Sequence, residues 1–418
     1  MLKLSTSAAL FAVMFLAVTG AIAADTTKDD LTTSISFGGP NSPQGQIEER
    51  TKEKLPAFRF DSIYDAFGPW REWKAQVKKK HGFDFSGHYA IAAQGASESL
   101  GGGSTSGSAG VLRLNGVWEL LNRGQDNPGK LAVTLDHRHA FNEPAPADLA
   151  GDIGYIGLTN TFFSDVGAAV INLNWQQSLN SGNSGFVAGR YDPNDYMNIL
   201  GYVNPWVSFT NLAVLLDVSV ALPDSSWGVA GGHWFNDQWY VLGGINDANG
   251  TATDDLEFFD GGSEHFKYAH IGWSPAKNQR YYSNVHLLVW DVDERDEAGV
   301  GAAHGFAIAS SWTFDKTWMP LLRYGKSSGD APIYTKSATI GLLRKFHFRS
   351  DLAGIAINWG ETPPVTGSTE QTTMEAFWNI QFARNLAFTP NIQYVRNPAL
   401  NPDDDEIWSA GIRARITF

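Results

Sequence analysis

The sequence contains no cysteine among its 418 residues. A disulfide scaffold, a thiolate metal site and a cysteine nucleophile are therefore all excluded. The stability of the fold must come from elsewhere, and the closure of a β-sheet is the source that we expect.

Long apolar runs are also missing after the amino terminus. A membrane-spanning helix needs about 20 consecutive apolar residues. The best run after Val18, from Leu212 to Leu222, is interrupted by Asp217. This excludes an α-helical membrane protein, but not a transmembrane β-barrel, which needs only alternating segments and is hidden in a hydropathy profile.

The chain has fewer basic than acidic residues. It contains 31 Lys and Arg and 44 Asp and Glu, which gives a formal net charge of -13. Without a basic stripe to meet phosphates, we expect no nucleic acid as a partner. The sequence also lacks a P-loop, an H-E-x-x-H motif and a nucleophile elbow. These motifs mark common enzyme classes. We therefore expect no enzyme activity, no catalytic residue, no cofactor and no metal site.

The clearest pattern that is present lies at the carboxy terminus, residues 406–418. Apolar residues from Trp408 through Ile412 to Phe418 alternate strictly with polar residues such as Arg413. One apolar face and one polar face are typical of a transmembrane β-strand between lipid and a lumen. A terminal aromatic after such a strand resembles the signature of bacterial outer-membrane barrels, so Phe418 is expected to engage the barrel-assembly machinery.

The amino terminus predicts export. Lys3 precedes an apolar core from Ala8 to Val18, and residues 21–23, Ala-Ile-Ala, fit a cleavage site. This is the pattern of a cleaved secretory signal peptide, residues 1–23. We expect a location in the bacterial outer membrane, in contact with its lipid and lipopolysaccharide.

Residues 24–81 are interpreted as a periplasmic segment that precedes the barrel. Its first part, residues 24–63, is polar and broken by glycine and proline, so we expect it to be mobile. A short helix should follow, with Pro69 in its first turn, lysines at its far end and Gly82 as its cap.

Residues 82–418 predict an all-β transmembrane antiparallel β-barrel of about sixteen strands. Long and short gaps alternate between the segments, as expected for external loops and periplasmic turns. The apolar stretches Ile153–Phe163 and Leu212–Val220 could raise the count to eighteen, but placing them inside long loops preserves the alternation. The predicted strands are 82–93, 108–121, 130–140, 166–178, 185–192, 226–235, 238–247, 266–275, 281–292, 303–314, 317–326, 336–346, 350–360, 371–383, 386–396 and 406–418.

Several motifs carry a family resemblance. They are Phe67-Gly-Pro-Trp-Arg, Lys79-Lys-His-Gly-Phe-Asp-Phe, Gly189-Arg-Tyr-Asp-Pro-Asn-Asp-Tyr196, Thr389-Pro-Asn-Ile-Gln-Tyr-Val-Arg-Asn-Pro-Ala-Leu-Asn-Pro402 and Trp408 to Phe418. In these stretches the chain resembles the carbohydrate-selective, OprB-like porins of Gram-negative outer membranes. It departs from them after Trp70, where the family usually has Gly-Gly-x-Arg.

The resemblance implies a passive channel for small monosaccharides or oligosaccharides. A general or anion-preferring porin is the alternative, and an outer-membrane barrel enzyme a more remote one. Both monomer and trimer remain open.

Strand alternation also assigns side chains to the lumen. Amide, carboxylate and guanidinium groups there can exchange hydrogen bonds with sugar hydroxyls, or can simply be hydrated. Closure should bring Arg413 and Arg415 near Arg113 and Arg138, with Arg190 two strands further, in a basic wall held by Asp136 and Glu119. The predicted pore-lining or sugar-binding residues are Arg113, Glu119, Asp136, Arg138, Asn174, Gln176, Arg190, Glu375, Asn379 and Arg413.

The long loop 193–225 is too apolar between Leu212 and Val218 to be well solvated. We expect it to fold into the barrel and to form the constriction, where aromatic rings could stack on pyranose faces. The residues predicted for this constriction loop are Tyr196, Tyr202, Trp206, Phe209 and Asp217.

A closed barrel predicts a simple behaviour on a gel. Because closure leaves no strand edge to fray, the folded barrel should resist detergent until it is boiled. Unboiled protein should therefore migrate differently from boiled protein. A helical circular-dichroism spectrum would contradict the predicted fold.

Overall fold

The computed structural model describes residues 37–418 except 53, 59, 198, 254–263, 297, 330, 347–349 and 364–369. The chain divides into units Met1–Thr32 and Thr33–Phe418, and everything described below belongs to the second unit. The predicted signal peptide, residues 1–23, lies outside the described residues.

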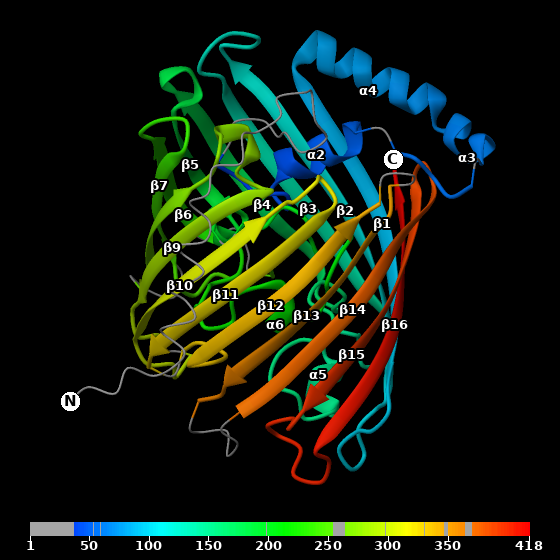
Figure 1. Ribbon diagram of the computed structural model, residues 1–418. Coiled ribbons are helices and arrows are strands. Elements are labelled where there is room, and N and C mark those ends of the chain that lie inside the picture. Colours follow the sequence, from blue (N-terminus) through cyan, green and yellow to red (C-terminus); the bar gives the residue numbers. More distant parts are fainter. Residues whose placement is uncertain are drawn as a thin grey trace. The chain divides into compact units, whose positions relative to one another are not determined.

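Sixteen antiparallel strands close into a barrel in which each strand pairs with its neighbours in sequence and β16 pairs with β1 (Figure 1). The predicted sixteen-stranded barrel is thereby confirmed. The stretches Ile153–Phe163 and Leu212–Val220 lie in loops and add no strands to it. The strands are β1 Phe83–Ala96, β2 Ser106–Leu121, β3 Gly129–Asn142, β4 Gly167–Leu179, β5 Ser184–Tyr191, β6 Ser226–Trp234, β7 Trp239–Asp247, β8 His265–Trp273, β9 Ser283–Val292, β10 Ala303–Trp312, β11 Trp318–Ser328, β12 Lys336–Lys345, β13 Leu352–Glu361, β14 Glu370–Ala383, β15 Leu386–Arg396 and β16 Glu406–Thr417.

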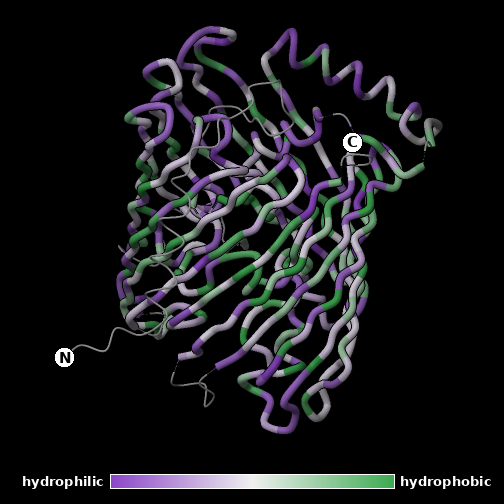
Figure 2. The backbone as a smooth tube through the Cα atoms, in the orientation of Figure 1, coloured by the Kyte–Doolittle hydropathy of each residue, from purple (hydrophilic) through white to green (hydrophobic). Residues whose placement is uncertain are grey.

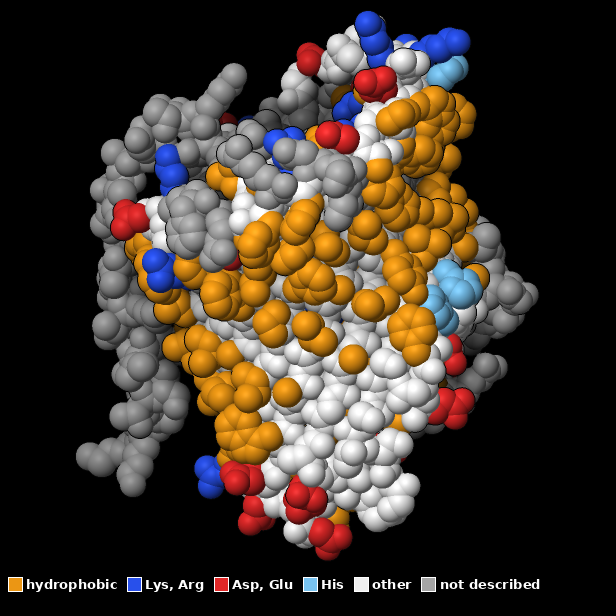
Figure 3. Space-filling view, turned by 90° about the vertical axis from the view of Figure 1, so that its right-hand side faces the viewer, with side chains coloured by type: hydrophobic (Ala, Val, Ile, Leu, Met, Phe, Trp, Pro, Cys, Tyr) orange, Lys and Arg blue, Asp and Glu red, His pale blue; other side chains and the backbone are white. Residues whose placement is uncertain are grey.

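The two faces of the barrel differ in polarity. Successive side chains of a strand point to opposite faces, so hydropathy alternates along each strand (Figure 2). Ile340 and Ile412 point outward and are 57% and 51% exposed, whereas Arg413, next to Ile412, is 4% exposed. Figure 3 shows the resulting belt of hydrophobic side chains on one side of the barrel. An apolar outer face is what lipid requires of a barrel.

A pair of helices precedes β1 at the end of the barrel that carries the short turns, which we assign to the periplasm (Figure 1). They are α3 Asp61–Ala66 and α4 Gly68–His81, and α4 is the helix predicted from Pro69 and Gly82. Gly82 caps it with φ 74°, a left-handed conformation that suits glycine. Trp118 donates its indole N–H to the carbonyl of His81 at 3.0 Å, which fixes the helix end to β2. No described helix is long and apolar enough to cross a membrane.

The segment before these helices lies inside the barrel, where helix α2 Pro43–Thr51 contacts β1, β2 and β3. Ile47 of α2 packs against Val117 and Ala132, whose side chains point inward. The prediction of a mobile periplasmic segment is therefore wrong for residues 37–52. Its polar composition is typical of disorder in water, but a polar lumen offers the same side chains fixed hydrogen-bond partners.

The connections on the long-loop side also enter the barrel. The β3–β4 loop contains α5 Leu149–Asp152, and the β5–β6 loop contains α6 Leu212–Leu215. Leu149 and Val214 are completely buried. Single 3₁₀ turns, η1 Asn180–Gly182, η2 Pro193–Asp195 and η3 Lys277–Gln279, complete the described elements.

The outward position of Ile340, near the middle of β12, gives a direct test of the lipid face. Replacing Ile340 by Arg should destabilise the barrel in liposomes by about 2–4 kcal/mol, because a charge would face hydrocarbon. Urea titration of folding into vesicles measures this change. Glu98→Arg, in the exposed loop after β1, should have little effect, and equal losses in both variants would refute the assignment.

Candidate functional site: the barrel lumen

Arg113, Asp136 and Arg138 form a buried charged triad on the inner face. Arg113 and Asp136 lie directly opposite each other on β2 and β3. Arg113 donates from Nε and Nη2 to the Asp136 carboxylate at 2.6 and 2.7 Å. Arg138, two residues along the same strand face, donates from Nε and Nη2 at 3.0 and 2.8 Å. The shared carboxylate fixes both guanidinium groups, as expected for bidentate Arg–carboxylate pairing.

Aromatic rings from the inward loops cover this triad. The Arg113 guanidinium carbon lies 4.6 Å from the Trp206 ring centroid, and that of Arg138 lies 5.2 Å from the Phe162 ring. The Trp206 indole N–H donates to the side-chain oxygen of Asn41 at 3.1 Å. Both long loops and the N-terminal segment therefore meet above the triad.

Glu375 holds the β5–β6 loop to β14. Its carboxylate accepts hydrogen bonds from the backbone N–H of Thr210 at 2.9 Å, from that of Asn211 at 2.9 Å and from the Asn391 amide at 3.1 Å. Asn211 is the N-cap of α6, so the carboxylate lies at the positive end of a short helical turn. Thus Glu375, which the sequence predicts to line the pore, binds loop backbone.

Arginines from two strands that are not neighbours in the barrel bind carbonyls of the same loop. Arg413 donates to the carbonyls of Pro205 and Ser208. Arg323 of β11 donates to the carbonyl of Leu215 at 2.9 Å and to that of Val214. Arg413 therefore lies in the lumen as predicted, but its donors bind the loop and not open space.

Amide side chains line β4 and β14. The Asn174 amide donates to the side-chain oxygen of Asn172 at 3.2 Å, and that of Gln176 donates to Asn174 at 3.1 Å and to the Tyr196 hydroxyl at 3.3 Å. Asn379 likewise donates to Thr389 at 2.8 Å. The predicted lumen positions of these amides agree with the structure.

Other predicted lumen positions are wrong. Arg190 neighbours Tyr191, whose hydroxyl donates to Asn246 inside the barrel, so Arg190 points to the outer face. There it donates to the carbonyl of Val170 at 2.7 Å and to that of Thr251. The β4–β5 and β5–β6 pairings are regular at this point, so simple alternation with Tyr191 places Arg190 on the outer face.

Glu119 also fails as a member of the basic wall. Its carboxylate accepts a hydrogen bond at 3.0 Å from the backbone N–H of Gly124, in the turn after β2. It therefore lies near the periplasmic rim, away from Arg113. Strand alternation predicts which face of the barrel a side chain points to. It does not predict the position of the residue along the barrel axis, which also depends on the turn geometry.

The predicted stacking platform of the loop is buried in protein contacts. Phe209 is fully buried and lies 4.8 Å from Phe377, and Tyr196 and Trp206 are 5% and 3% exposed. Half-buried Tyr202 packs 5.2 Å from Tyr282. These rings hold the loop in place and are not free to stack on a sugar in this conformation.

Asp217, the remaining predicted residue of this loop, is also buried. It accepts hydrogen bonds from the backbone N–H and the hydroxyl of Ser219 at 3.1 and 2.7 Å. Burial raises its pKa, and Arg323 opposes that rise. Asp217 thus closes a turn at the wall instead of facing solute.

Sequence reasoning missed important lumen residues. Arg50 and Arg280 belong to segments without strand periodicity, so nothing in the sequence places them inside the barrel. Arg280 donates to the carbonyl of Phe37 at 2.8 Å. Arg323 is different, because it lies in strand β11 on the same inner face as Met319 and Leu321. Met319 and Leu321 are apolar because the β5–β6 loop packs against them.

Comparisons with known proteins agree with this architecture. Residues 273–418 match the family model described as carbohydrate-selective porin, OprB family. The high-pH structure of Pseudomonas putida OprB superposes with a TM-score of 0.68 at 14% identity, covering 84% of this chain and 97% of that chain. The low-pH structure of the same protein gives 0.52 at 13% identity, with the same coverages.

None of the curated proteins compared with the chain matches it in sequence. The family match covers the carboxy-terminal part of the chain, including the strand pattern that first indicated a barrel, and the shared fold extends over the remaining strands. The chain is thus similar to the carbohydrate-selective porins of the OprB family, in sequence over residues 273–418 and in fold over the barrel.

Proposed function

We propose that this protein is an outer-membrane porin through which small sugars diffuse passively into the periplasm. The observation that carries the proposal is a closed barrel with an apolar outer face and a polar inner face crossed by an inward loop. A barrel of this kind provides a hydrated path through lipid. The family match to carbohydrate-selective porins supports the choice of solute.

Sugar selectivity would reside in the fixed guanidinium groups of the triad. Arg138 uses Nε and Nη2 on Asp136, which leaves Nη1 as a donor for a passing hydroxyl. Because Asp136 holds the group in place, little side-chain entropy is lost when a sugar binds. A hydroxylated solute can then replace part of its water shell with protein donors.

A general, anion-preferring porin is the second candidate, and the charge of the inner wall favours it. On the strands of the inner wall, buried arginines outnumber buried carboxylates, and Asp195 and Asp217 of the inward loop supply further negative charge. The buried inner-wall charges are Arg113, Arg138, Arg323 and Arg413 against Asp136 and Glu375. Such a wall attracts anions whether or not it recognises sugars.

The junction between the N-terminal segment and the β5–β6 loop restricts the path. Gly39 donates its backbone N–H to the Asp195 carbonyl at 2.5 Å, and the Asn41 amide donates to the Asp195 carboxylate at 3.0 Å. Burial raises the pKa of Asp195 to about 6, although Arg113 opposes the rise. Because the pKa is raised, the protonated carboxyl of Asp195 stabilises the junction. This stabilisation is fully present below the usual pKa of 3.8 and is lost as the pH rises through about 6.

The triad yields a prediction for selectivity. Arg138→Ala removes a charged donor but leaves the Arg113–Asp136 pair, so sugar block of the ion current should weaken roughly tenfold. Conductance without sugar should change much less. Planar-bilayer recordings with glucose measure both quantities, and Arg396→Ala, at the exposed end of β15, is the matched control. If Arg138→Ala changes only the anion-to-cation ratio, the anion-preferring function is the correct one.

The junction yields a prediction for pH. Conductance should rise between about pH 5 and about pH 8, because burial penalises the ionised Asp195 carboxylate by more than the Asn41 hydrogen bond stabilises it, and the junction that narrows the path is weakened. Asp195→Asn should flatten that dependence, whereas Asp237→Asn, exposed in the turn after β6, should retain it. Single-channel recording across this range is the measurement. An unchanged pH profile in Asp195→Asn would disprove the role of this carboxyl.

A further inference from the structure

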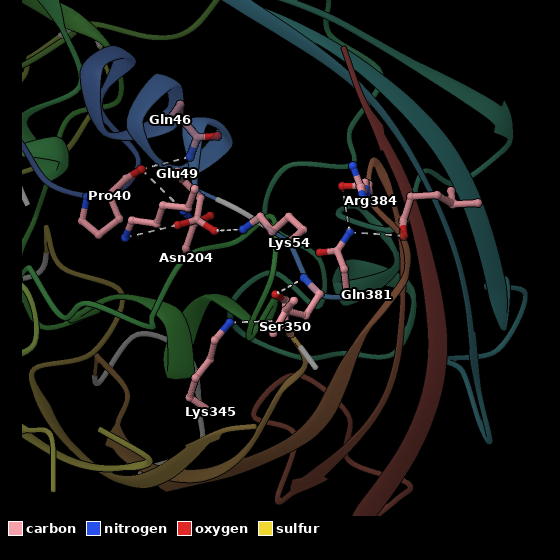
Figure 4. Close-up of polar contacts among 12 residues, drawn as sticks. Pro40, Gln46, Glu49, Lys54, Asn204, Lys345, Ser350, Gln381 and Arg384 are labelled. Carbon is pink, nitrogen blue, oxygen red and sulfur yellow. Dashed lines mark hydrogen bonds and ion pairs between the residues drawn. The ribbon is translucent and has the colours of Figure 1, made fainter. Parts of the chain in front are cut away.

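A small cavity lies at the periplasmic mouth of the barrel, between α2 and the strands β14 to β16. Its volume is about 40 Å³, and Arg50, Lys54, Asn385 and Arg415 are among its lining residues. Figure 4 shows one side of this region, where Glu49 and Lys54 face each other and Gln381 turns toward Arg384. The volume holds about three waters or one tetrahedral ion.

Several hydrogen-bond donors around this cavity have no partner within the described residues. They are Nε and Nη1 of Arg50, Nε of Arg415 and the amide nitrogen of Asn385, and all are buried. Arg50 also donates from Nη2 to Nδ1 of His88 at 2.6 Å. That imidazole nitrogen supplies a lone pair but no negative charge, so it does not neutralise the guanidinium.

The carboxylate at this cavity is already engaged. Glu49 pairs with Lys54 and, at 3.7 Å, with Lys52. Burial alone would raise the pKa of Glu49, but these lysines outweigh burial and hold it at about 2. Burial, together with repulsion from Arg415, lowers the pKa of Arg50 to about 9. Glu49 also lines the cavity and attracts both guanidinium groups, but its carboxylate is hydrogen-bonded to Lys54, so the two arginines share one carboxylate that is already engaged.

We propose that this cavity is a binding site for a small oxyanion, either free phosphate or sulfate or the acidic group of a larger solute. Buried guanidinium N–H groups without hydrogen-bond partners are costly, and an anion between Arg50 and Arg415 would accept from them. Planar guanidinium groups match oxyanions because several N–H groups can bind different oxygens. A pyranose ring is too large for this volume, so an intact neutral sugar is not the ligand.

Binding here would connect parts of the chain that are distant in sequence. Arg50 belongs to α2 inside the lumen, whereas Arg415 belongs to the closing strand β16. A bound oxyanion would fasten the N-terminal segment to the barrel wall and would favour the restricted path. This effect does not depend on which solute the porin carries.

The test is calorimetry of inorganic phosphate with the purified full-length protein in detergent, against chloride at matched ionic strength. We expect saturable phosphate binding that weakens at least about tenfold in Arg50→Gln and in Arg415→Gln, since each loses charged hydrogen bonds. Arg396→Gln, at the opposite end of the barrel, is the charge-matched control and should bind normally. Because Arg415 lies in a strand, Arg50→Gln in α2 provides a test that does not depend on strand pairing.

Gluconate then distinguishes the two sources of the oxyanion. Displacement of phosphate by gluconate, but not by the neutral sorbitol, would assign the site to the acidic end of a solute. Absence of displacement would assign it to the free ion. Phosphate binding no tighter than that of chloride, or unchanged binding in both Arg variants, would overturn the proposal. The outcomes of these phosphate-binding experiments do not bear on sugar block of the ion current, which is measured separately.

Discussion

The need to satisfy every backbone hydrogen bond within lipid governs this structure. A sheet that crosses a membrane has no water at its edges, so it must close on itself. Here the closing pair is β1 with β16, in register from His88 with Thr417 to Ala96 with Ser409. Closure forces alternate side chains into lipid and lumen, and the apolar belt and the polar interior both follow from it.

The same constraint explains how irregular chain is accommodated inside the barrel. Loop carbonyls and N–H groups at this depth need fixed partners, and charged side chains of the wall supply them. Glu375 accepts from the N–H groups that precede α6, while Arg323 and Arg413 donate to loop carbonyls. Lumen charges therefore have a structural task that competes with solute binding, and the triad around Asp136 is the part of the wall that can combine both.

Period-two alternation assigned the correct face to most predicted wall residues, and Arg190 is the exception. Arg113, Asp136 and Arg138 lie on the inner face because β2 and β3 pair regularly around them. Arg190 points to the outer face because it alternates with inward Tyr191, and β5 pairs with β4 and β6 without a register shift. The loop aromatics were placed correctly inside the barrel, yet their burial against Phe377 and other wall residues depends on contacts distant in sequence.

By itself, the sequence determined the barrel and the polarity of most strand faces, because period-two alternation and turn spacing are local properties, whereas the choice between sixteen and eighteen strands needed the structure. Only the tertiary structure decided what fills the lumen. Residues 37–52 have the composition of a solvated segment, and their place beside β1, β2 and β3 depends on partners that closure creates. Arg50 meets Arg415 for the same reason: segments at opposite ends of the chain become neighbours only when the sheet has closed.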